Sequence, residues 1–143
     1  MTPPPLLRGV TGVPVTHPKG RIIHRLIRAG VALYAAHTSA DAARPGVNDR
    51  LAELLGVTPG APLTPVPDGV DPATATGIGR VGDLDTPMTL REFTARVADR
   101  LPATVGGVRA AGDPDRIIRR VALASGAGDS FLGTGASLDV DCF

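Results

Sequence analysis

The sequence predicts an α/β fold, in which a layered mixed sheet is flanked by helices. Helical patterns alternate along the chain with apolar runs that are short enough to be strands. The core has to be built from aliphatic residues, because aromatic residues make up only 3% of the 143 residues. The 18 glycines and 14 prolines favour many short elements over a bundle of long helices.

In the first half of the chain, helix, strand and helix are expected in turn. Residues 18–28 are predicted to be helical, because Pro18 suits a first turn and Gly30 suits the position just after the last turn. The apolar stripe of this helix comprises Ile22, Ile23, Leu26 and Ile27. The continuous apolar run 31–37 predicts a strand buried on both faces, as in a parallel sheet. A second helix is predicted over 46–55.

A proline-rich linker is expected over residues 59–76, between a first α/β part, 1–58, and a second, 77–143. In the second part Thr89 is the predicted N-cap of a helix, because Glu92 three residues later completes a capping box. The further elements predicted are strands at 77–82, 104–110 and 117–124, a short helix near Phe131, and a strand that begins within 138–143.

Composition excludes several classes of protein. A net charge of +1 argues against a dedicated nucleic-acid-binding domain. The single cysteine, Cys142, excludes an internal disulfide and a cysteine-rich zinc site. No apolar stretch approaches the roughly 20 residues that a membrane-spanning helix needs, and the first residues have no secretory pattern. A cytoplasmic protein without a membrane partner is therefore expected.

The segment from His37 to Asp41 is the first candidate site, because it follows the predicted buried strand. In open α/β sheets ligands bind at that end of the strands. An imidazole and a carboxylate there could hold a metal or move a proton. The alternative is a polar turn in which Asp41 accepts hydrogen bonds from local backbone amides, and residue types alone favour this turn.

Two further segments have a functional and a structural interpretation. The loop Ser125–Ser130 could hold a phosphate on its glycine amides, but it lacks the lysine and spacing of a P-loop, which favours a tight turn. A nucleotide contact through this loop with Arg21, Arg25 and Arg28 is a third hypothesis. A solvated helix face is the simpler interpretation of these arginines.

Four blocks of the sequence, in order, resemble one family, the Nif-three-like dinuclear metal centre proteins, also known as GTP cyclohydrolase I type 2 homologues. The blocks are Tyr34-Ala-Ala-His37-Thr-Ser-Ala-Asp41 with Gly46-Val-Asn-Asp49, Gly77-Ile-Gly-Arg-Val-Gly82, Pro87-Met-Thr-Leu-Arg-Glu-Phe93 and Ser125-Gly-Ala-Gly-Asp-Ser-Phe-Leu132. The resemblance implies two α/β lobes, both incomplete here, and a homohexamer. It also implies a pair of divalent metals, zinc, iron or manganese, between the lobes.

The resemblance also implies a ligand set, of which this chain keeps little. Asp41 matches the family's aspartate ligand, and His37 matches a histidine near the metal site. The family's two adjacent histidines fall where this chain has Pro3, Pro4 and Pro5, and proline offers no lone pair to a metal. The family's late histidine and glutamate are expected to lie beyond Phe143.

Two functions follow as hypotheses. The first is a metal-binding, hydrolase-like protein of this family that is inactive in the present form, because a divalent site usually needs three or more protein ligands. The second is a non-enzymatic interaction module that binds a full-length homologue or another copy of itself.

Overall fold

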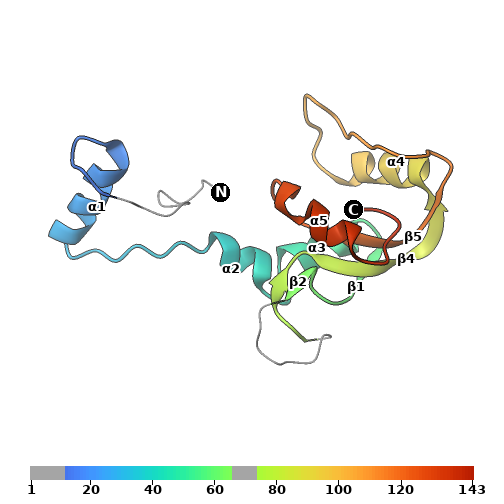
Figure 1. Cartoon of the computed structure of the whole chain (residues 1–143), viewed down its shortest axis with the longest axis horizontal. Coiled ribbons are helices and arrows are strands. Elements are labelled where there is room, and N and C mark those ends of the chain that lie inside the picture. The colour runs from blue at the N-terminus through green and yellow to red at the C-terminus, as the bar shows by residue number, and fades with distance from the viewer. Residues whose placement is uncertain (1–11, 66–73) are drawn as a thin grey trace. The chain divides into compact units, whose positions relative to one another are not determined.

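The computed structural model describes residues 12–65 and 74–143 and divides the chain into two compact units, Met1–Ser39 and Ala40–Phe143 (Figure 1). The predicted linker, 59–76, lies partly outside the described residues, and the predicted three-part division stays a prediction. In the described part of the chain, no helix is both long and apolar enough to cross a membrane.

The first unit contains helix α1 (Pro18–Arg28), which confirms the predicted helix. Pro18 occupies the first turn, and Gly30 follows the last turn with a positive φ of 63°. The N–H groups of Ala29, Gly30 and Val31 donate to carbonyls of the last turn, which ends the helix. Arg25 and Arg28 lie in that last turn, where positive charge complements the helix dipole.

The predicted strand at 31–37 is wrong. Residues 31–36 form neither helix nor strand and are exposed, and His37 instead begins helix α2 (His37–Ala42) (Figure 1). A strand needs a neighbouring strand to pair with its N–H and C=O groups. Residues 12–39 of this unit contain no strand that could pair with the segment. The apolar run has the composition of a buried strand without the sheet that would bury it.

The second unit places α3 (Val47–Leu54) before a three-stranded antiparallel sheet of order β1-β4-β5. The strands are β1 (Val57–Pro59), β4 (Arg80–Thr89) and β5 (Ile117–Leu123), and β2 (Thr64–Pro65) pairs with β3 (Gly77–Ile78) in a separate ribbon. Helix α4 (Leu90–Arg100) follows β4, while η1 (Asp129–Phe131) and α5 (Leu132–Ala136) follow β5. The mixed α/β class is confirmed, although these strand pairs are antiparallel rather than parallel.

Two apolar clusters cover opposite faces of this sheet. The larger cluster packs α3 and α4 on one face and comprises Ala52, Leu55, Val57, Leu84, Met88, Leu90, Phe93, Ile118, Val121 and Leu123. On the other face Val81 and Ala122 pack with Leu63, and Phe131 of η1 lies against them. Neighbouring residues of β5 alternate between the two clusters, as a two-faced strand requires, so the unit is layered as predicted.

Two strands predicted for the second unit, at 104–110 and within 138–143, have different outcomes. The predicted strand at 104–110 is wrong: the segment is exposed, and Gly107 has a positive φ of 61° in a turn closed onto Thr104. The expected strand within 138–143 is present only as a single parallel bridge between Cys142 and Val121 of β5. Asp141 supports this bridge, because its carboxylate accepts the backbone N–H groups of Arg119 and Arg120.

Candidate functional site

Asp41 lies in α2, half-buried, and its carboxylate is held by a side chain from a distant part of the chain. The hydroxyl of Ser125, just after β5, donates to Oδ1 of Asp41 over 2.6 Å. These two residues were separate candidates in the sequence, and the structure brings them together. The Ser125 hydroxyl, 84 positions away in the chain, is a partner of Asp41 that lies outside any local turn.

Asn48 of α3 completes a ring of hydrogen bonds with the same two residues. Its amide donates to the backbone carbonyl of Asp41 over 2.8 Å, and its oxygen accepts the N–H of Ser125 over 2.7 Å. The Asn48 side chain is fully buried, and an unmade hydrogen bond at such a position would cost about 1–3 kcal/mol. Asn48 therefore fixes the separation of α2 from the loop after β5.

Beneath this ring, Arg80 of β4 forms a buried ion pair with Asp49. Its Nε and Nη2 donate to the two carboxylate oxygens, each over 2.7 Å. The other three N–H groups donate to the carbonyls of Gly77, Gly79 and Ala43. All five donors of a fully buried guanidinium are thus satisfied, and the α2–α3 connection is joined to β3 and β4.

The groups around Asp49 stabilise the negative charge of its carboxylate. Burial raises its pKa, but the hydrogen bonds from Arg80 and Gly46 and the charges of Arg80 and Arg44 outweigh burial. The net result is a pKa below its ordinary value. Arg44 also donates to the carbonyls of Pro59 and Gly60, so the ionised carboxylate anchors the segment that carries Asp41 to the sheet.

His37 lies four residues before Asp41, at the start of α2, and its side chain is exposed. The other two histidines are not near a ligand set: the ring of His24 contacts the carbonyl of Val13 over 3.0 Å, and His17 precedes α1 as its N-cap residue. Burial and the charge of Asp141 raise the pKa of the Cys142 thiol. This favours the inert thiol over a nucleophile.

The residues that the structure describes do not complete a metal site. Within 12–65 and 74–143, no group of three or more histidine, cysteine, aspartate or glutamate side chains comes close enough to hold an ion. Asp41 supplies a carboxylate of suitable chemistry for a divalent cation, but one such ligand binds weakly and without selectivity. Metal chemistry at this site therefore needs ligands that the described residues do not provide.

The loop Ser125–Ser130 is built as a tight turn. Gly126 and Gly128 have positive φ values of 83° and 72°, and the N–H of Phe131 donates to the carbonyl of Gly128. The N–H of Ser125 is used by Asn48. These contacts favour the turn over the phosphate-binding interpretation.

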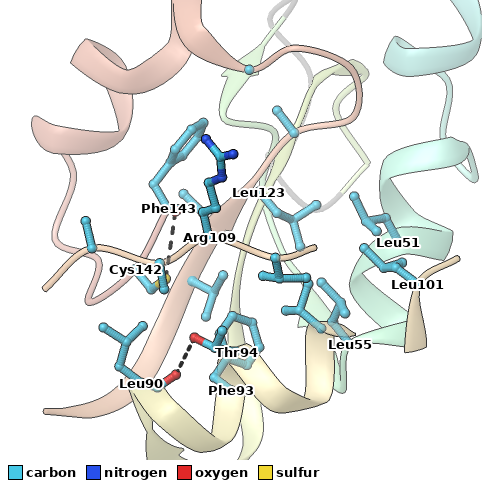
Figure 2. Close-up of a pocket in the computed structure, with 18 of the residues that line it drawn as sticks. Leu51, Leu55, Leu90, Phe93, Thr94, Leu101, Arg109, Leu123, Cys142 and Phe143 are labelled. Atoms are coloured by element: carbon cyan, nitrogen blue, oxygen red, sulfur yellow. Dashed lines mark hydrogen bonds between the residues drawn. The ribbon is translucent and has the colours of Figure 1, made fainter. Parts of the chain in front are cut away.

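A cavity of about 430 Å³ lies within the second unit, between α4 and the segments around β5 (Figure 2). Most of its lining is apolar, with Leu55, Phe93 and Leu123 among the side chains. Of the polar side chains, Thr94 donates its hydroxyl to the carbonyl of Leu90 over 2.7 Å. The cavity has no converging pair of acid and base, so it adds nothing to the chemistry of Asp41.

Sequence reasoning missed Asn48, Asp49 and Arg80 as a structural support of the site. A signal was present, because an arginine between Gly79 and Val81 in an otherwise apolar strand has to find a partner if it is buried. Which carboxylate it would meet could not be inferred, since Asp49 lies 31 positions away.

The fold and the site define a mixed α/β protein in which two segments distant in sequence hold a single carboxylate. The chain belongs to the Duf34/NIF3 (NGG1p interacting factor 3) family, whose model matches residues 3–143. It is 48% identical over 140 residues to a Streptomyces coelicolor protein named GTP cyclohydrolase 1 type 2 homolog. That match covers 98% of this chain and 48% of the relative, so the chain spans about half the length of this relative.

Other relatives agree. A Mycobacterium tuberculosis protein of the same name is 31% identical over 242 residues, covering 98% of this chain and 64% of the relative. Because 242 aligned residues exceed the 143 of this chain, the mycobacterial protein carries residues inside the matched region that this chain lacks. The crystal structure of a Bacillus cereus protein related to NIF3 matches with a TM-score of 0.67 at 21% identity, over 96% of this chain and 63% of that one. It supports the fold alone.

Proposed function

We propose that this chain is a metal-binding, hydrolase-like protein of its family that contributes Asp41 as one ligand of a divalent metal pair and is inactive by itself. The pair would be zinc, iron or manganese. The observation that carries the proposal is the fixed carboxylate: Ser125 and Asn48 orient Asp41, as the surroundings of a ligand usually do. His37, four residues earlier, is proposed to lie near the metals without being a ligand.

Inactivity is part of the proposal, because Asp41 is the one matched member of the family's ligand set among the described residues. A metal-bound water becomes a useful nucleophile only when the ion is held firmly with an open position, and one carboxylate cannot do this. A cytoplasmic location is part of the proposal, because the single cysteine of the chain cannot form an internal disulfide. The names of the relatives support the hydrolase-like class, while the reaction of this chain is not assigned.

Metal content tests this proposal directly. The chain is purified with zinc, iron or manganese and dialysed, and bound metal is measured per chain. We expect almost none to remain. Before dialysis, weak Mn²⁺ binding followed by NMR line broadening should centre on Asp41 and disappear in Asp41→Asn, while Asp129→Asn, which removes an exposed carboxylate from η1, serves as the matched control.

Two results would overturn the proposal. One or two tightly held ions per chain would mean that the site is complete. Mn²⁺ broadening that is unchanged in Asp41→Asn would mean that this carboxylate is not a ligand.

A second candidate function is a non-enzymatic interaction module, which binds a full-length homologue or another copy of this chain. The exposed apolar side chains of the first unit favour it, since Ile27 is 71% and Tyr34 81% exposed, and a partner would remove this apolar surface from water. Mixing the chain with the full-length Streptomyces coelicolor relative and measuring mass by light scattering tests it. A family-type homohexamer or a mixed complex supports this function, and unchanged separate masses contradict it.

A further inference from the structure

We draw no further inference here: the strongest candidate, the apolar cavity between α4 and β5 with the exposed Arg109 in its lining, carries no proposal, because Cys142 and Phe143 form part of that lining in a chain that spans about half the length of its Streptomyces coelicolor relative, and nothing in the structure shows what fills the cavity.

Discussion

At the scale of single residues, the support of the candidate site depends on Arg80, whose five N–H groups all donate to partners within the second unit. Arg80→Met leaves the carboxylate of Asp49 buried without its bidentate partner. Breaking a buried ion pair from one side costs about 3–5 kcal/mol. We expect a loss of that size in the free energy of unfolding, measured by urea titration with far-ultraviolet circular dichroism.

Arg50→Met is the matched control, because Arg50 also pairs with a carboxylate, that of Glu53, but on the surface. An exposed pair three residues apart on a helix contributes about 0.2–0.5 kcal/mol. Equal losses for the two variants would contradict the assigned importance of the buried pair.

The same ion pair predicts how stability depends on pH. The folded-state pKa of Asp49 lies below its ordinary value of 3.8, despite burial, because of Arg80, Gly46 and Arg44. The ionised form therefore contributes stability above that ordinary value, and this contribution is lost as pH falls through the folded-state pKa. Urea midpoints measured from neutral to acidic pH should fall more steeply below about pH 4 in the wild type than in Asp49→Asn. Identical slopes would contradict the prediction.

Residue patterns revealed the candidate carboxylate but not its support. Asp41 could be selected because it sits in a block that resembles a family motif. Ser125 lies in another of the four blocks that resemble the family. No rule of sequence spacing predicts that it contacts Asp41, which is 84 positions away. Only the folded chain shows that Asn48 joins them, because this contact depends on how α3 packs against β4 and β5.

At the scale of elements, local signals predicted α1, α3 and α4 well, but not α2. Pro18 and Gly30 mark α1, and the pair Thr89 and Glu92 marks the start of α4, where both hydrogen bonds of the capping box are present. Strands were harder to predict, because they depend on a partner that can be far away. The runs 31–37 and 104–110 had suitable composition, but no described strand pairs with either.

The capping box can be tested by one substitution. The hydroxyl of Thr89 accepts the N–H of Glu92, and the carboxylate of Glu92 accepts the N–H of Thr89. Thr89→Ala removes the first bond and should lower the free energy of unfolding by about 1 kcal/mol. Thr89→Ser keeps the hydroxyl and should cost less in the same urea titration. Equal losses would show that packing of the threonine methyl group, rather than the cap, sets the effect.

At the scale of the whole molecule, the described apolar core belongs to one unit. Both apolar clusters lie within the second unit, Ala40–Phe143. The buried ion pair between Arg80 and Asp49 lies there too. None of the buried apolar residues recorded for the described chain comes from residues 12–39. The second unit should therefore fold without the first.

A chain that begins at Ala40 tests this independence. It should unfold cooperatively with a melting temperature within about 4 °C of the corresponding transition of the whole chain, since a loss of 1 kcal/mol shifts a domain of this size by about 4–8 °C. The amide NMR signals of β4, β5 and α4 should keep their positions, because the contacts around them are unchanged. If deletion of residues 1–39 collapses these signals or broadens the transition, then the first unit supplies packing to the second, and the predicted independence of the second unit is wrong.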